Sequence, residues 1–239
     1  MEIMTFGGGV RQLECARILG SLPRGGRILL LPIPTTKDNE YIFGTDIRLA
    51  EIESMTEDDS LLVGYRLPEW LNIRGRRLDV SLDGEFQGKN AELTALGCLG
   101  YLLTYGEITI PEQKIGIVGY GRIGSRLLRL LLMLGCSVKV YTTRASVADE
   151  LCRMGIGAVI MDGAEDYSGL DLLINTAPAR LIDQSRLAEQ VRIIELASGD
   201  NFDGDSRLVR LPSIPERMYP ISAGRVYADA VIRHLEAKE

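Results

Sequence analysis

The sequence predicts an α/β protein built on a doubly wound parallel sheet, with a smaller α/β domain before it. Strand-like and helix-like segments alternate through the second half of the chain, which is typical of parallel sheets. A glycine-rich turn joins one of these strands directly to a helix. The length of 239 residues is sufficient for two small domains.

Apolar runs bounded by glycine, proline and polar residues define the expected elements in order. Strands are expected at 3–6, 27–31, 61–65, 77–82, 114–118, 137–141, 157–160, 171–175 and 192–196. Helices are expected at 10–19, 46–54, 91–105, 123–134, 146–154, 184–190 and 222–237. We expect Asn90 and Ser222 to cap the helices that follow them, because their side chains can accept a hydrogen bond from a helical N–H group.

A glycine-rich turn after the strand 114–118 carries the strongest functional signal. Its glycines follow the spacing G-x-G-x-x-G. In Rossmann dinucleotide-binding domains the first glycine turns the chain, the second admits a pyrophosphate, and the third lets the helix approach the sheet. We therefore predict a dinucleotide site; the alternative is a turn that binds nothing. The residues expected to bind are Gly119, Tyr120, Gly121, Arg122, Ile123 and Gly124.

The residues after the next strand indicate which coenzyme binds. NAD-binding domains place an acidic side chain about 20 residues beyond the glycines, where it binds the ribose 2′-OH. Here Thr142, Thr143 and Arg144 occupy this region, and residues 142–146 include no carboxylate. Because arginine can bind a 2′-phosphate through two hydrogen bonds, we favour NADP over NAD. The alternative is that Arg144 is a solvated loop residue and backbone groups hold the ribose.

Two further strand ends are expected to face the same ligand crevice, which lies at the carboxyl ends of a parallel sheet. The first is followed by Asn175, Thr176, Ala177 and Pro178, which we assign to the nicotinamide half of the coenzyme. The second is followed by Ser198, which could bind the nicotinamide or the substrate. An ordinary turn stopped by the proline is the alternative for the first segment.

A second glycine-rich turn, at 7–9, joins the first expected strand to a helix without the dinucleotide spacing. Free N–H groups at a helix start and a nearby arginine suit a carboxylate, so we predict a substrate-anion site here. The alternative is a tight turn with a surface arginine. The expected substrate-binding residues are Gly8, Gly9, Arg11, Gln12, Thr35, Thr36 and Ser222.

Composition argues against several classes of function. The 27 basic and 33 acidic residues give a formal charge of −6, with no sign of nucleic-acid binding. No apolar stretch approaches the roughly 20 residues of a membrane span, and the acidic Glu2 stands where a signal peptide needs a basic residue. Four scattered cysteines and a single histidine lead us to expect a cytoplasmic protein with reduced thiols and no metal site.

Taken together, the motifs resemble those of the dipicolinate synthase A-subunit family, a relative of the D-2-hydroxyacid dehydrogenases, in a shortened and diverged form. The likeness keeps its order through most of the chain. The matching segments are GGGVRQLE at 7–14, LPIPTT at 31–36, NAE at 90–92, GYGRIG at 119–124, YTTRAS at 141–146, NTAP at 175–178, LAS at 196–198, PSIP at 212–215 and SAG at 222–224.

Together with the order of the elements, this resemblance implies two domains and a final helix: a flavodoxin-like α/β domain on the substrate side at 1–88, a Rossmann domain at 89–221 that includes the bridging helix 91–105, and a helix at 222–239 that packs back towards the first domain. It also implies a step of dipicolinate biosynthesis in sporulation, in which dihydrodipicolinate gives a hydride to NADP and a proton to a base. The family's A-type polypeptide acts with a flavoprotein-like B-type polypeptide, and the same likeness favours a homodimer.

The same resemblance directs the search for catalytic groups. Lactate-type chemistry needs an acid–base group, commonly histidine, and the loop 219–222 has none. Oxidation to an aromatic ring depends less on such an acid–base group, because the main requirement is to position the C–H bond of the substrate against the nicotinamide. We take Glu92 as the candidate proton acceptor and Ser198 as a second catalytic candidate; a structural role in the bridging helix is the alternative for Glu92.

Two other functions stay open. Gly199 stands where the family has an arginine, and the first domain is short, which favours a non-catalytic NADP-binding protein with a regulatory or scaffold role. The missing histidine also leaves room for an NAD(P)-dependent reductase of another small imine or keto acid.

Overall fold

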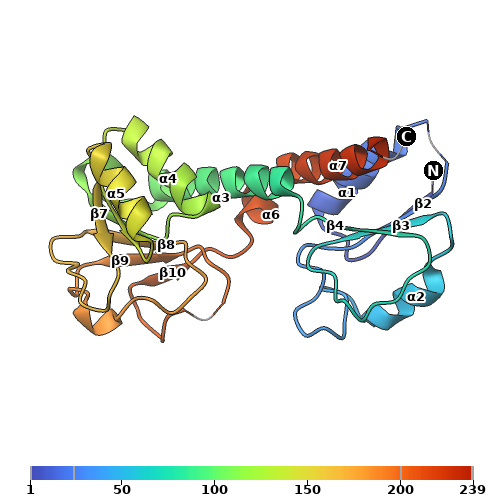
Figure 1. Ribbon diagram of the computed structural model, residues 1–239, viewed down its shortest axis with the longest axis horizontal. Helices are drawn as coiled ribbons and strands as arrows, with labels where there is room; N and C mark the ends of the chain where they lie inside the picture. Colours follow the sequence, from blue (N-terminus) through green and yellow to red (C-terminus); the bar gives the residue numbers. More distant parts are fainter. Residues whose placement is uncertain (1, 24, 200, 238–239) are drawn as a thin grey trace. The chain divides into compact units, whose positions relative to one another are not determined.

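The computed structural model describes residues 2–23, 25–199 and 201–237, and it separates into two compact units. The first unit comprises Met1–Asn90 and Pro215–Glu239, and the second comprises Ala91–Ile214. The sequence predicted the second division later, at 221/222. The structure places it earlier, between Ile214 and Pro215, and the ion pair of Glu216 with Arg11 lies within the first unit. Each unit contains one parallel sheet (Figure 1), so the predicted α/β class is confirmed.

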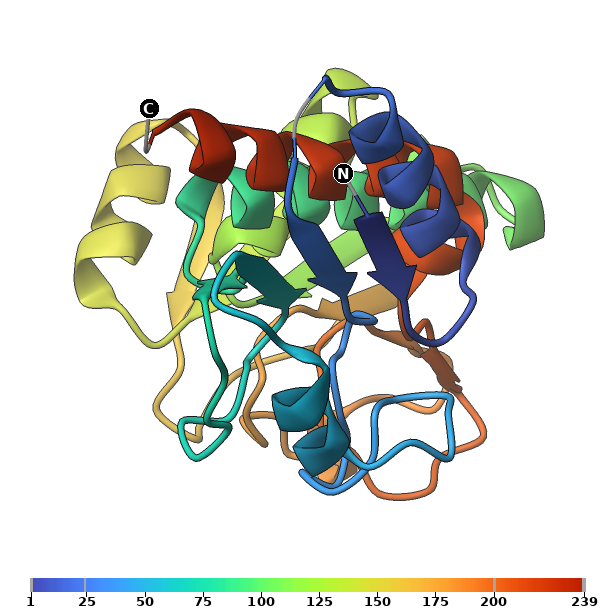
Figure 2. The same ribbon diagram turned by 90° about the vertical axis from the view of Figure 1, so that its right-hand side faces the viewer.

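The first unit contains a four-stranded parallel sheet in the order β1-β2-β3-β4. Its strands are β1 (Glu2–Thr5), β2 (Arg27–Leu30), β3 (Ser60–Gly64) and β4 (Arg76–Asp79). Its helices are α1 (Val10–Gly20), α2 (Ile52–Met55) and α7 (Pro220–Glu236), with a 3-10 turn η1 (Leu49–Glu51) before α2. Figure 2 shows α1 and α7 together over one face of this sheet and α2 on the other.

Alternating side chains of the central strand β2 explain the two layers, because successive residues of a strand point to opposite faces. Ile28 and Leu30 pack with α1 and α7, whereas Leu29 packs with the cluster around α2. Helices α1 and α7 approach closely at Gly224, where a Cβ would lie 2.7 Å from the carbonyl oxygen of Arg11. The glycine of the SAG segment is therefore required by helix packing.

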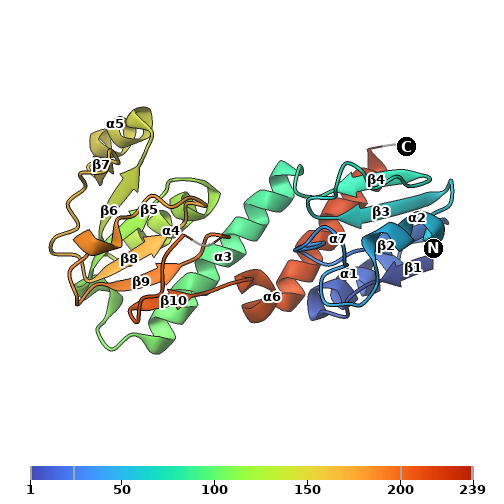
Figure 3. The ribbon, with the colours of Figure 1, turned by 90° about the horizontal axis from the view of Figure 1, so that it is seen from below.

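The second unit contains a six-stranded parallel sheet in the order β10-β9-β8-β5-β6-β7 (Figure 3). This is the strand order of a doubly wound dinucleotide-binding fold. Its strands are β5 (Lys114–Val118), β6 (Ser137–Thr142), β7 (Gly157–Ile160), β8 (Leu172–Asn175), β9 (Arg192–Glu195) and β10 (Leu208–Arg210). Its helices are α4 (Arg122–Met133) and α5 (Ala145–Arg153), and α3 (Gly84–Tyr105) enters it from the first unit.

Among the residues that the structure describes, regular helices cover only one face of this second sheet. Buried side chains of α3, α4 and α5 share one core with the strands. On the other face, the segments after β7, β8 and β9 are irregular, and the second core there includes Tyr167, Leu187 and Phe202. The helix expected at 184–190 is wrong: only the 3-10 turn η3 (Gln184–Arg186) forms, opened by the Asp183 carboxylate, which accepts from the Ser185 N–H.

The structure corrects both predicted helix caps. Helix α3 begins at Gly84, and the Asp83 carboxylate accepts from the N–H groups of Glu85 and Phe86, so Asn90 lies inside the helix. Helix α7 begins at Pro220, a favoured first helical position, so Ser222 lies within the first turn. The sequence also missed β10, the 3-10 turn η2 (Ile110–Glu112) and the short helix α6 (Ile214–Met218).

Candidate functional site

The glycine turn between β5 and α4 has the shape that its spacing predicts. Gly119 adopts φ +93°, a left-handed conformation that favours glycine, and its N–H donates to the carbonyl of Tyr141 at 2.8 Å. A Cβ at Gly124 would lie 2.2 Å from the Gly119 carbonyl oxygen, so only glycine fits there. A Cβ at Gly121 would meet nothing within 4 Å. The middle glycine therefore borders open space, into which a phosphate group could fit.

The start of α4 lies next to this open space. Gly121 is the residue before the helix, and its carbonyl accepts from the Ser125 N–H at 3.0 Å. The N–H groups of a first helical turn have no partner within the helix, and they attract anions. Arg122 is exposed at the first helical position, and its carbonyl accepts from Arg126 at 2.9 Å. Two arginines therefore lie at this end of α4.

Arg144 lies against the glycine turn. Its guanidinium Nη2 donates to the Tyr120 carbonyl at 2.6 Å, and its N–H donates to the Thr142 hydroxyl at 3.2 Å. Thr142 is buried, whereas Thr143 and Arg144 are exposed. The end of β6 thus presents an ordered, exposed cation beside the open space of the turn.

The ends of β8 and β9 are tied together by buried polar side chains. Asn175 is fully buried, and its amide Nδ2 donates to both carboxylate oxygens of Glu195, at 3.1 and 3.2 Å. Thr176 is half-buried, and its hydroxyl donates to the carbonyl of Val118 at 3.0 Å. Asn175 therefore shapes the turn that follows it, and it does not present its side chain to solvent.

The remaining predicted residues of this edge are accessible. Ala177 is half-buried, and Pro178 and Ser198 are exposed. Gly199 adopts φ +108°, and a Cβ there would lie 3.7 Å from Oδ1 of Asn201. Glycine suits this left-handed turn, which gives Gly199 a local conformational reason.

Sequence reasoning missed Glu195, which is 3% exposed at the last position of β9. Burial raises the pKa of this carboxyl, and hydrogen bonds from Asn175 and from the Ala197 N–H oppose that rise. The sequence signal that could have indicated Glu195 is a glutamate directly after the apolar residues Ile193 and Ile194 of a predicted strand. Glutamate is rarely buried without partners, so a glutamate in such a position suggests a specific set of hydrogen bonds.

The first unit has its own glycine turn, between β1 and α1. Gly7 and Gly8 adopt φ +82° and +33°. Arg11 is 3% exposed, and its Nε lies 3.1 Å from a carboxylate oxygen of Glu216. The other oxygen, Oε1, lies 2.7 Å from where a Cβ of Gly9 would be. Arg11 is therefore not the surface arginine of the alternative interpretation, and the protein's own carboxylate lies at the start of α1.

The other residues assigned to the substrate divide into two groups. Gln12 and Thr35 are buried and bonded to backbone: the Gln12 amide donates to the Phe6 carbonyl, and the Thr35 hydroxyl accepts from the Tyr65 N–H at 2.8 Å. Thr36 and Ser222 are half-buried, and the Thr36 hydroxyl donates to Asp38 at 3.0 Å. The first group supports the fold of the turn, and the second has side chains nearer to solvent.

Glu92, the candidate proton acceptor, is exposed on α3. Its helix is fixed to the first unit by ion pairs at its start. Arg233 of α7 bonds to the Asp83 carboxylate at 2.8 Å, and Lys89 bonds to Asp229 at 3.1 Å. Burial alone would raise the pKa of Asp83, but the Phe86 N–H and Arg233 outweigh it and hold that pKa below its ordinary value.

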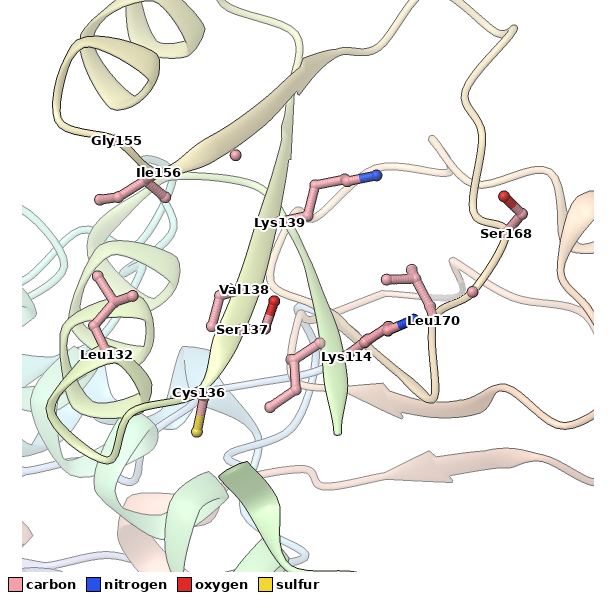
Figure 4. Close-up of a pocket in the computed structure, with 13 residues that line it drawn as sticks. Lys114, Leu132, Cys136, Ser137, Val138, Lys139, Gly155, Ile156, Ser168 and Leu170 are labelled. Carbon is pink, nitrogen blue, oxygen red and sulfur yellow. The ribbon is translucent and has the colours of Figure 1, made fainter. Parts of the chain in front are cut away.

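A cavity of about 370 Å³ lies at the opposite end of the second sheet (Figure 4). Lys114 and Ser137, the first residues of β5 and β6, line it together with Ser168. The predicted site residues are not among its lining. Over the described ranges, no cluster of three His, Cys, Asp or Glu side chains could hold a metal, and no helix has the length and apolarity to cross a bilayer.

No family model matches this sequence. The A subunit of dipicolinate synthase from Bacillus subtilis (strain 168) is 25% identical over 158 residues, which cover 61% of this chain and 53% of that protein. The match therefore spans about half the length of the curated relative.

Solved structures share the fold over nearly the whole chain. The crystal structure of the dipicolinate synthase A subunit from Bacillus halodurans has a TM-score of 0.81 at 20% identity, covering 98% of this chain and 97% of that one. An NAD-complexed D-isomer specific 2-hydroxyacid dehydrogenase from Lactobacillus delbrueckii ssp. bulgaricus has a TM-score of 0.56 at 10% identity, covering 100% and 97%. The predicted resemblance is confirmed: this chain is similar in sequence to the dipicolinate synthase A subunit, and it has the α/β fold of that protein and of the 2-hydroxyacid dehydrogenase.

Proposed function

We propose that this chain is an NADP-dependent oxidoreductase of the dipicolinate synthase A-subunit type, which oxidises dihydrodipicolinate or a closely similar cyclic dicarboxylate. The observation that carries the proposal is the glycine turn, which is closed at Gly119 and Gly124 and open in front of Gly121. The similarity to the A subunit supports the choice of substrate class.

In this proposal the coenzyme phosphates bind at the start of α4, where Gly121 leaves room and the first-turn N–H groups can donate to them. Arg122 contributes a positive charge, and Tyr120 and Ile123 complete the wall of the turn. Arg144, held against the Tyr120 carbonyl, binds a 2′-phosphate with its remaining N–H groups, and Thr143 adds a hydroxyl. This set favours NADP over NAD.

The nicotinamide half lies, in the same proposal, at the ends of β8 and β9, against Thr176, Ala177, Pro178 and Ser198. When bound, the oxidised coenzyme supplies the hydride acceptor. The protein's part is to hold the C–H bond of the substrate in line and to exclude water. The substrate loses a hydride with its bonding electron pair and a proton to a carboxylate, for which Glu92 is our candidate, and its ring becomes aromatic.

The substrate carboxylate is assigned to the turn at Gly8 and Gly9, with Thr36 and Ser222 as neighbouring donors. Arg11 is already paired with Glu216, so an incoming anion competes with an internal one. We therefore propose that Glu216 lowers the affinity of this site for anions. In this proposal Gln12 and Thr35 do not touch the substrate; their side chains form hydrogen bonds to backbone groups that shape the site.

Calorimetric titration of NADP and NAD into the wild type and Arg144→Ala tests the coenzyme assignment. We expect wild type to prefer NADP, and Arg144→Ala to lose about 10- to 100-fold in NADP affinity, since hydrogen bonds to charged groups contribute about 1.5–3 kcal/mol. NAD affinity should change little. Arg129→Ala, which removes another exposed arginine of α4, is the matched control. Equal binding of NAD and NADP by wild type would contradict the proposal.

Incubation with enzymatically made dihydrodipicolinate and NADP, followed at the absorbance of the reduced nicotinamide, tests the reaction. Glu92→Gln should lower turnover with little change in coenzyme affinity, and unchanged turnover would remove Glu92 as the base. The assay is run with and without the flavoprotein-like B-type partner that the resemblance implies, because the relative is named as one subunit of an enzyme. Analytical ultracentrifugation tests the proposed homodimer.

A second candidate function rests on Gly199. Its left-handed turn at the end of β9 stands where the family has an arginine, which favours a regulatory or scaffold protein that binds NADP without hydride transfer. Coenzyme binding with no turnover on any candidate acid would support this function. Turnover on another imine or keto acid would instead support a reductase.

A further inference from the structure

Glu195 and Asn175 form a buried polar pair at the carboxyl end of the second sheet. They are the last residues of β9 and β8, and they are partners in the parallel register. The Glu195 carboxylate accepts from the Asn175 amide at 3.1 and 3.2 Å and from the Ala197 N–H at 2.8 Å. One carboxylate therefore holds the chain segments that leave both strands.

Asn175 also forms hydrogen bonds within the turn after β8. Its amide Nδ2 also donates to the Ala177 carbonyl at 3.1 Å, and its Oδ1 accepts from the Ala177 N–H at 3.1 Å. Thr176, between them, donates its hydroxyl to the carbonyl of Gly119 at 3.2 Å. Contacts thus run from Glu195 through Asn175 to the turn at 176–177, and from there to the glycine turn.

A carboxylate at such a position is costly for the fold. Both residues are almost completely buried, and removing a charged group from water is unfavourable unless it gains hydrogen bonds. An apolar residue at the end of β9 would extend the apolar run of Ile193 and Ile194 without that penalty. The carboxylate therefore needs a role that an apolar side chain cannot perform, and fixing two loops by accepting several hydrogen bonds is such a role.

We infer that Glu195 is a positioning residue for the nicotinamide half of the coenzyme, acting through Asn175 and the Ala197 N–H on the loops at 176–178 and 197–198. This inference rests on the proposed coenzyme site. Glu195 is buried and does not touch the coenzyme; its effect reaches the ligand through the two loops.

The experiment compares NADP with 2′-phospho-ADP-ribose, the part of the coenzyme without nicotinamide, by calorimetry. In Glu195→Gln, an NH₂ group replaces one carboxylate oxygen and faces the Asn175 amide, so two donors meet and the turn shifts. We expect about tenfold weaker NADP binding, the loss of roughly one charge-assisted hydrogen bond, and less than about twofold change for the fragment. Glu189→Gln, at an exposed carboxylate of the same unit, is the matched control and should change neither.

If Glu195→Gln binds both ligands more weakly by the same factor, or binds both with unchanged affinity, the inference is overturned, whereas the proposed coenzyme site is not. Failure of wild type to bind either ligand overturns the proposed function first, so the two failures are distinguishable. Thermal unfolding monitored by circular dichroism shows whether Glu195→Gln is folded.

A second measurement needs no variant. Protonation of Glu195 removes an acceptor, so wild-type NADP affinity should fall relative to fragment affinity as the pH drops through the raised pKa of this carboxyl. The comparison cancels the titration of the 2′-phosphate, which both ligands carry. The groups that face Glu195 are the uncharged Asn175 on β8, the uncharged Asn201 and the guanidinium of Arg210 on β10. A constant affinity ratio across the range would count against the inference.

Discussion

The two glycine turns of this protein look alike in the sequence and differ in what lies in front of them. Both join a parallel strand to a helix. The turn before α4 leaves open space at Gly121, and an exposed arginine borders it. The turn before α1 has the carboxylate of Glu216 against Gly9 and a buried Arg11 beside it. The start of α4 thus leaves room for an anionic ligand, whereas an anion that binds at the start of α1 competes with an internal carboxylate.

The largest effect is expected from glycine substitutions in the open turn. Gly124→Ala should lower the free energy of unfolding of the second unit by about 2–4 kcal/mol, because its Cβ would meet the backbone of Gly119, which cannot move aside cheaply. Gly121→Ala should leave stability nearly unchanged and remove coenzyme binding. Chemical denaturation and calorimetry on both variants measure the difference. Equal stability of the two variants would contradict the geometry described for this turn.

A smaller effect is expected from the internal anion of the other turn. Glu216→Gln should cost about 1–2 kcal/mol of stability, since a buried guanidinium loses its charged partner while a partly exposed amide can still accept from it. The same change should raise affinity for pyridine-2,6-dicarboxylate several-fold, because the substrate carboxylate no longer competes with Glu216. Arg217→Gln, an exposed neighbour on α6, is the control. Unchanged dicarboxylate affinity would mean that this turn is not an anion site.

Burial of Glu195 predicts a modest pH dependence of stability. Its pKa is raised in the folded protein, so the folded state holds a proton that the unfolded state has released. Stability should therefore fall as the pH rises from the ordinary glutamate pKa through the raised one, by no more than about 1.4 kcal/mol per pH unit. Urea titrations of wild type and Glu195→Gln across this range test it. If Glu195→Gln showed the same dependence of unfolding free energy on pH as the wild type, Glu195 would be excluded as its cause.

The smallest effect on stability is expected from a substitution of Gly9 in the turn before α1. The close contact of a Cβ at Gly9 would be with the end of the flexible Glu216 side chain, and its contact with Gln12 would have an ordinary distance of 3.6 Å. Gly9 itself has an ordinary extended conformation at φ −69°. Gly9→Ala should therefore cost about 0.5–1 kcal/mol, mainly because alanine is the weaker residue before a helix. A loss comparable to that of Gly124→Ala in the same denaturation series would show that this turn is as tightly packed as the other.

Much of the dinucleotide-binding unit could be predicted because its signals are local. The strand–glycine–helix order, the strands β5 to β9 and the helices α4 and α5 follow from apolar periodicity and from residues that only tight turns require. The prediction failed where tertiary contacts decide. The 184–190 segment has helical composition, but Leu187 packs into an irregular layer, and the Asp183 carboxylate supports only one 3-10 turn.

The candidate site, like the fold, could be predicted from the sequence only where the signals are local. The sequence located the glycine turn, Arg144 and the segment at 175–178, because each lies at the end of a recognisable strand. It could not show that Asn175 points inwards to Glu195, or that Arg11 is buried, because such burial depends on partners from distant segments. A short helix such as α6 carries too few residues for a periodic pattern, so no sequence signal indicated Glu216.

The amino-acid order is sufficient to set the α/β class, the doubly wound type of the second unit and the position of the glycine turn before α4. These properties depend on glycine's missing side chain and on the periodicity of neighbouring residues, which are set before any long-range contact forms. Long-range packing sets which helix start leaves room for a ligand, which carboxylates are buried and which face of the second sheet the described helices cover. Those outcomes depend on competition between distant groups for the same space and the same hydrogen bonds.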